Sequence, residues 1–173
     1  MPSHDGCVTL NPSQLQSAVN VGAARHMAAL RRGLEDRHGA LAGGWSLHIE
    51  GACGEYAAAI ALHLPWTPNI NTFKGPAGDI GRGVEVRTRS RHDYDLIVRK
   101  DDFNRPFVLV TGIAPHFRVR GWIMGDDAKR PEWLREHGGR EAAYFVPFEA
   151  LRPLIELEEA QFALSRNHGG DDQ

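Results

Sequence analysis

The stretch GDIGRGVEVRT, residues 78–88, largely decides how this chain is expected to fold, because its second half alternates apolar and charged residues. Successive side chains of a strand point to opposite faces. A strand over 83–88 therefore directs its valines into a core and sets Glu85 and Arg87 together on the other face. The stretch predicts a strand with one buried face and one charged face.

The glycines before this strand predict a tight turn. Gly81 and Gly83 flank Arg82, and glycine adopts the backbone conformations that short turns demand. A turn at this point would fold Asp79 back beside Glu85. Two carboxylates held so close repel each other unless a positive charge lies between them, and a divalent cation is a natural partner. The hairpin is therefore a candidate metal site, and its alternative interpretation is a solvated charged hairpin.

Helical patterns precede the hairpin and strand patterns surround it. Apolar residues recur every three or four positions over 13–34, which predicts an amphipathic helix that packs on the core or on a partner. GACGEYAAAIALHL, from Gly51, predicts a second helix with Glu55 in its first turn, preceded by a short apolar segment over 45–49. Five strands are predicted at NTFK (71–74), GVEVRT (83–88), YDLIVR (94–99), PFVLVTG (106–112) and FRVRGWI (117–123).

The remaining segments complete one domain. AYFVP predicts a last strand, and the region of about 148–165 predicts a C-terminal helix that is interrupted or started near Pro153. The residues 167–173 predict a disordered tail. No internal repeat or linker divides the chain. The sequence therefore predicts a single α/β domain over 1–173, with a mixed, largely antiparallel sheet flanked by helices.

Composition places the chain among soluble globular proteins, since 42% of its 173 residues are hydrophobic and 24% are charged. No apolar run reaches the roughly 18 residues that would span a bilayer, and the N-terminus lacks a secretory pattern, so we expect a cytoplasmic protein without a membrane partner. Cys7 and Cys53 have no metal-binding or disulfide spacing and are predicted to be free thiols.

Positive charge is concentrated in one segment. The formal net charge of −2 provides no overall attraction to nucleic acid, so any contact with a polyanion must be local. Arg82, Arg89, Arg91 and His92 are candidates to contact DNA phosphates, although a solvated hairpin rim explains the same pattern. The acids in RHDYD and KDDFNRP are typical of turns.

The order of the charged residues resembles the PD-(D/E)XK nuclease superfamily, which includes restriction endonucleases and Holliday junction resolvases. Glu55 on a helix precedes Asp79 at the start of a strand, and Glu85-Val86-Arg87 follows where the family has Glu-x-Lys. The resemblance covers about residues 50–123. It implies a restriction-endonuclease-like αβββαβ core over about 45–148.

The resemblance also implies a chemistry. Glu55, Asp79, Glu85 and the carbonyl of Val86 would bind Mg²⁺ or Mn²⁺, and the protein would hydrolyse phosphodiester bonds of duplex or branched DNA. Arg87 keeps the positive charge of the family's lysine and can clamp a phosphate, but it does not readily release a proton. Lys74 could supply an ammonium group from a neighbouring strand.

Two other classes of function stay open. The first is a catalytically silent protein that keeps a nuclease-like fold and binds DNA or a protein partner. The second is a structural or assembly protein, and a homodimer is among the partners that stay open. The glycines do not fit a nucleotide-binding phosphate loop, because no GK[ST] follows them and the next segment has a strand pattern.

Overall fold

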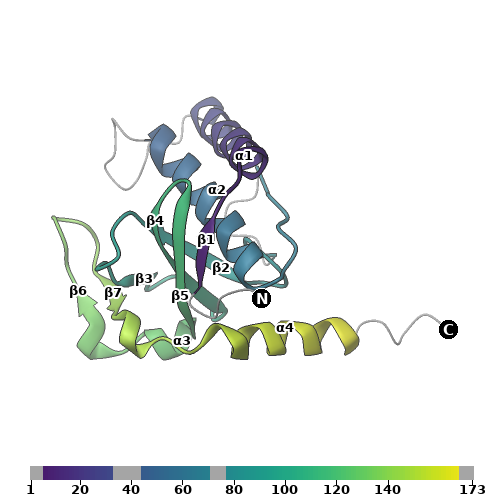
Figure 1. Ribbon diagram of the computed structural model, residues 1–173. Coiled ribbons are helices and arrows are strands. Elements are labelled where there is room, and N and C mark those ends of the chain that lie inside the picture. The colour runs from purple at the N-terminus through teal and green to yellow at the C-terminus, as the bar shows by residue number, and fades with distance from the viewer. Residues whose placement is uncertain (1–5, 33–43, 71–76, 168–173) are drawn as a thin grey trace.

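The computed structural model describes residues 6–32, 44–70 and 77–167, and it shows two helices stacked on one face of a sheet. Helix α2 (Gly44–Ala61) packs on the sheet, and α1 (Pro12–Arg31) packs on the outer side of α2 (Figure 1). The C-terminal helix α4 (Leu154–Asn167) runs along the base of the molecule and extends past the sheet. The predicted α/β class is confirmed.

The strands form two sheets. The larger has the order β1-β5-β4-β2, with the bounds β1 (Cys7–Thr9), β2 (Glu85–Arg89), β4 (Pro106–Ile113) and β5 (His116–Met124). Strands β2 and β4 run parallel, whereas the other neighbours are antiparallel. The smaller sheet is antiparallel, with the order β3-β7-β6 and the bounds β3 (Leu96–Arg99), β6 (Leu134–Arg135) and β7 (Ala143–Val146). The expected mixed, largely antiparallel pairing is present, divided between two sheets.

Most predicted strands lie where the sequence places them. Strands β2 to β5 each begin and end within two residues of the predicted bounds, and β7 corresponds to AYFVP. The strand predicted over 71–74 lies outside the described residues. The segment between β5 and β7 has short elements besides β6, namely α3 (Gly125–Ala128) and the 3₁₀ helix η1 (Pro131–Trp133).

Two helix starts differ from the predicted bounds. Helix α2 is continuous from Gly44, so the expectation of a separate apolar segment before a helix starting at Gly51 is wrong. Glu55 consequently lies in the middle of α2 and not in its first turn. The C-terminal helix begins at Leu154, which agrees with the predicted start near Pro153 and not with the bound near residue 148. Phe148–Ala150 forms a separate 3₁₀ helix, η2. The predicted tail after Asn167 lies outside the described residues.

Strand β4 is buried on both faces and separates two cores. Val108 and Val110 pack with the alanine-rich face of α2, whereas Phe107 and Leu109 pack with residues of the smaller sheet. The charged side chains of β2 lie on the same side as the second core, because β2 pairs with β4 in register. No helix within the described ranges is long and apolar enough to cross a membrane.

Gly54 allows α2 to approach β2 closely, so we expect Gly54→Ala to destabilise the protein. A Cβ at this position would overlap the Thr88 hydroxyl, and overpacking of this kind costs about 1–3 kcal/mol. Gly51→Ala is the matched control, because a Cβ there meets nothing within 4 Å. Urea denaturation should show a lower free energy of unfolding for Gly54→Ala. For Gly51→Ala the free energy of unfolding should rise by up to about 1 kcal/mol. Equal effects would contradict this packing.

Candidate functional site

Asp79 is held in a tight turn directly before β2. Its N–H donates to the Val84 carbonyl at 2.7 Å, and Ile80 forms an antiparallel bridge with Val84. Gly81 and Gly83 have φ angles of 52° and 71°, which side chains rarely adopt. The predicted turn is therefore confirmed, and it brings the Asp79 carboxylate to the start of β2.

The Asp79 carboxylate is buried near two other acids. Its Oδ2 atom accepts a hydrogen bond from the Val86 N–H at 2.7 Å. Burial, followed by the negative charges of Glu55 and Glu85, raises the pKa of Asp79 to about 7. The Val86 N–H and the charge of Arg87 act in the opposite direction. Asp79 therefore exchanges its proton near neutral pH, and additional positive charge would favour its ionised form.

Glu55 is neutralised by an arginine from α1. Arg25 donates Nη1 to Oε1 at 2.6 Å and Nη2 to Oε2 at 2.9 Å. Trp66 donates its indole N–H to Oε2 at 3.2 Å. Burial would lower the pKa of Arg25, but the hydrogen bonds and charge of Glu55, with a contribution from Asp79, raise it. Because Glu55 is only 6% exposed, this pair is largely removed from water.

Glu85 and Arg87 lie in contact on one face of β2. Arg87 donates Nη1 to Glu85 Oε1 at 2.7 Å and Nη2 to Asp102 Oδ2 at 3.1 Å. Arg105 approaches the second Glu85 oxygen at 3.4 Å. Burial would lower the pKa of Arg87, but the charges of Glu85 and Asp102 raise it. Arg87 is thus a permanently charged group fixed between two carboxylates.

The predicted site residues are brought together only in part. Glu55 and Glu85 lie near enough to Asp79 for their charges to act on it, and Val86 contacts Asp79 through its N–H. Within residues 6–32, 44–70 and 77–167, no three acidic, histidine or cysteine side chains are placed to hold one metal ion together. Lys74 lies outside the described residues.

The predicted DNA-contacting residues have different surroundings. Arg91 pairs with Asp93 at the surface, at 2.8 and 2.9 Å. Arg89 stacks on the Tyr94 ring, and burial lowers its pKa despite the nearby charges. His92 is bonded to Thr111 on β4 at 2.9 Å. Arg82 follows Asp79 in the turn and is exposed.

Helix α4 fixes the turn that carries Asp79. The Arg82 N–H donates to Gln161 Oε1 at 2.8 Å, and Gln161 Nε2 donates to the Arg82 carbonyl at 3.2 Å. Gln161 is buried, so its amide is occupied by this one backbone segment. The turn is therefore held from outside its own hairpin.

Several groups of this site have no signal in the sequence. Arg25 and Arg105 belong to unremarkable polar patterns, and Gln161 lies 79 residues from the turn that it contacts. Asp102 is indeed in a turn, as its composition predicts, but its carboxylate also holds Arg87. An alternation pattern shows which face a charge occupies but does not identify its partner.

Comparisons with family models, with curated proteins and with solved structures give no match for this chain. The class that the fold defines is an α/β protein with a mixed four-stranded sheet and a smaller antiparallel one.

Proposed function

We propose that this protein is a metal-dependent nuclease that hydrolyses DNA phosphodiester bonds and has a restriction-endonuclease-like core of the PD-(D/E)XK type. The observation that carries the proposal is Asp79, a buried carboxyl group whose pKa is raised to about 7 near Glu55 and Glu85. Three acids contributed by a helix, a turn and a strand match the order of the superfamily motif. A carboxyl group in such surroundings gains strongly from a divalent cation.

The donor atoms are suitable for Mg²⁺ or Mn²⁺, which prefer carboxylate and carbonyl oxygens. Within the described residues, Asp79 Oδ1 accepts no hydrogen bond, whereas both oxygens of Glu55 are bonded. Glu85 could exchange its longer contact with Arg105, at 3.4 Å, for an ion. The carbonyl of Val86 would complete the protein's donors. A bound ion would supply Lewis acid charge and an activated water.

The cations of the site have separate roles in this proposal. Arg87, oriented by Glu85 and Asp102, would pair with the scissile phosphate and counter the charge that develops on it. Arg25 fixes the Glu55 carboxylate in orientation. Lys74 would add an ammonium group. Four side chains in one segment would contact DNA phosphates, namely those of Arg82, Arg89, Arg91 and His92.

A cleavage assay tests the proposal. We expect the purified protein to cut linear or branched DNA in Mg²⁺ or Mn²⁺ and not in EDTA. Asp79→Ala and Glu85→Ala should each slow cleavage by about 100-fold or more, the usual cost of losing an electrostatic group from an active site. Glu149→Ala is the matched control, because it removes an exposed carboxylate for which the structure gives no contact. Absence of cleavage by the wild type, or equal rates for Glu85→Ala, would reject the proposal.

A second candidate is a catalytically silent protein that keeps the fold and binds DNA or a protein partner. It is favoured by one observation, namely that arginines already occupy oxygens of both Glu55 and Glu85. This candidate predicts salt-sensitive DNA binding that persists in EDTA, without cleavage. Loss of binding on metal removal would count against it.

A further inference from the structure

A row of paired residues crosses the larger sheet on the face away from α2. Arg89 on β2 pairs with Thr111 on β4, Thr111 pairs with Arg118 on β5, and Arg118 pairs with Cys7 on β1. Directly paired residues point to the same face of a sheet. The neighbouring Val110 points the other way, into the core beneath α2. The row therefore places two arginines and a threonine on one face.

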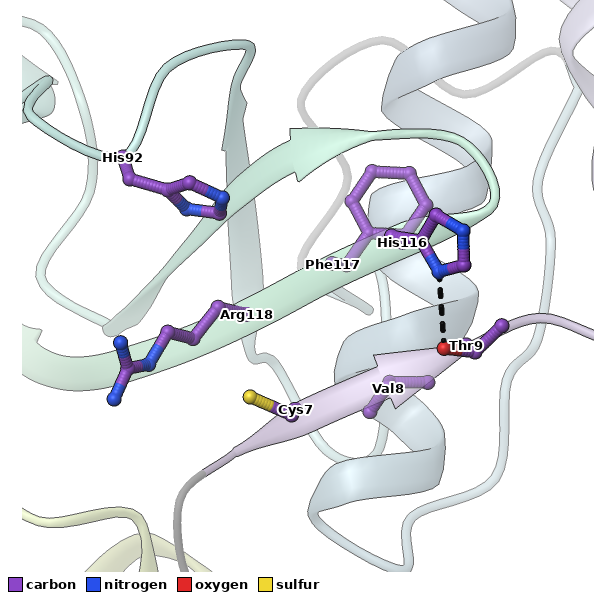
Figure 2. Close-up of a pocket in the computed structure, with 7 residues that line it drawn as sticks. All are labelled: Cys7, Val8, Thr9, His92, His116, Phe117 and Arg118. Atoms are coloured by element: carbon purple, nitrogen blue, oxygen red, sulfur yellow. Dashed lines mark hydrogen bonds between the residues drawn. The ribbon is translucent and has the colours of Figure 1, made fainter.

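A pocket of about 340 Å³ opens over this row (Figure 2). Its polar lining consists of Arg118, His92, His116, Thr9 and Cys7, with no carboxylate among its residues. The two histidines enter it from different segments, His92 from the loop after β2 and His116 from the start of β5. The pocket is therefore positive or neutral in character and selects against a cation.

Hydrogen bonds hold both imidazole rings in place. His92 Nδ1 lies 2.9 Å from the Thr111 hydroxyl, which is fully buried. His116 Nδ1 lies 3.1 Å from the Thr9 hydroxyl, as drawn in Figure 2. Among the described residues, the Nε2 atoms of the two rings make no hydrogen bond. Each ring thus keeps one nitrogen for a ligand.

Arg118 is the main charge of the pocket. Its carbonyl accepts from Thr111, but its guanidinium has neither a hydrogen bond nor an ion pair within the part of the chain that the structure describes. In the same row, Arg89 Nη1 is buried without a hydrogen-bond partner. The other sheet-face arginine of β5, Arg120, stacks on Phe148. A guanidinium that lines the same pocket as two imidazoles fits an oxyanion, because its planar fork matches phosphate geometry.

We propose that this pocket binds a phosphate group, with Arg118 as its principal contact and His92 and His116 beside it. Along β2, the row lies four residues from Glu85, or about 13 Å at the usual rise of a strand, and Arg118 lies two strands further across the sheet, or about 10 Å in that direction. A backbone phosphate of bound DNA is the natural source at that distance from the acidic site. This choice of source rests on the proposed nuclease function, whereas the anion site does not.

The site is tested with the full chain in EDTA, so that no metal chemistry contributes. Inorganic phosphate is titrated while the side-chain NMR signals of arginines and histidines are followed. We expect the wild type to show saturable shifts at Arg118, His92 and His116. Arg118→Ala should weaken phosphate binding about tenfold or more, as expected for the loss of a charge-assisted hydrogen bond. Arg118→Gln should weaken it similarly and retain the side chain's bulk.

The control is Arg31→Ala, which makes the same charge change. Arg31 is an exposed arginine at the end of α1, on the other side of the sheet, and its side chain has no partner among the residues that the structure describes. Phosphate binding should be unchanged in this variant. Equal effects of Arg118→Ala and Arg31→Ala, or no saturable shift in the wild type, would overturn the site.

A second arm distinguishes the source of the phosphate. A short single-stranded DNA is titrated in EDTA against the same variants. DNA is supported as the ligand if Arg118→Ala binds DNA more weakly and Arg31→Ala does not. The salt dependence of DNA binding by Arg118→Ala should then fall by about one phosphate contact. Loss of inorganic phosphate binding alone supports the pocket and rejects DNA as its source. Failure of the wild type to cleave DNA in Mg²⁺ rejects the nuclease proposal and leaves both binding results intact.

Discussion

Replacing Arg25 with alanine is expected to lower the free energy of unfolding by about 3–5 kcal/mol, the cost of leaving a buried charge without its partner. Glu55 would keep only the indole N–H of Trp66 at 3.2 Å. Its side chain is 8% exposed, so water replaces little of the lost contact. Urea denaturation of the wild type and Arg25→Ala at pH 7 measures the difference.

Two further variants separate the charge from the packing. Arg25→Met combined with Glu55→Leu removes both charges and should recover most of the lost stability, because apolar side chains of similar size often replace a buried pair at little cost. The free energy of unfolding of Arg25→Lys should lie between those of the wild type and Arg25→Ala, because an ammonium group cannot donate to both carboxylate oxygens as a planar guanidinium does. A loss below about 1 kcal/mol for Arg25→Ala would mean that Glu55 is not the desolvated partner described.

The turn around Asp79 could be predicted because its determinants are local. Glycines on either side of Arg82 permit the positive φ angles, and the alternation after them defines the faces of β2. The contact of Glu85 with Arg87 follows from the same period of two. These features depend on neighbours within about ten residues, which a single sequence displays directly.

The contacts that neutralise the acids could not be predicted, because they join distant segments. Arg25 meets Glu55 across 30 residues, through the packing of α1 on α2. The periodicity of α1 shows that one face is apolar but not which carboxylate its arginine reaches. Because the sequence does not show these arginine partners, its carboxylates are expected to be available to a metal ion. In the structure, Glu55 and Glu85 are already paired with arginines.

The start of α2 was misread for a related reason. Gly51 and Gly54 lower helix propensity by about 1 kcal/mol each, so a helix boundary near Gly51 is the local expectation. Tertiary packing overrides it, because Gly54 provides the space that the Thr88 side chain occupies. Strand β1 was missed because its three residues are too few to show an alternation.

Asp79→Asn is expected to remove a pH dependence from the stability of the protein. The pKa of Asp79 is about 7 in the folded chain, above the value of about 3.9 for an unperturbed aspartate. Between these values the folded state binds more protons than the unfolded state. The contribution of Asp79 to the free energy of unfolding is therefore fully present below about pH 4 and is lost as pH rises through 7. Between these pH values the free energy of unfolding falls by up to about 1.4 kcal/mol per pH unit.

Urea denaturation of both proteins from pH 4.5 to 8.5 tests this sign. The variant should gain stability relative to the wild type as pH rises, and the difference should level off above about pH 8, where Asp79 is ionised in both states. Glu149→Gln, at an exposed acid, provides the control and should show no such trend. A stability difference that stays constant with pH would contradict a buried carboxyl group with a raised pKa at residue 79.

A divalent cation should reverse the same trend if the acids bind it. Because the ion requires the ionised carboxylate, Mg²⁺ or Mn²⁺ should stabilise the wild type above pH 7 and have less effect on Asp79→Asn. Binding at pH 6 should release a proton, which calorimetry in buffers of different ionisation enthalpy detects. Proton release by the wild type and not by the variant would support a metal site at Asp79. Its absence would favour the catalytically silent alternative, in which arginines alone neutralise the acids.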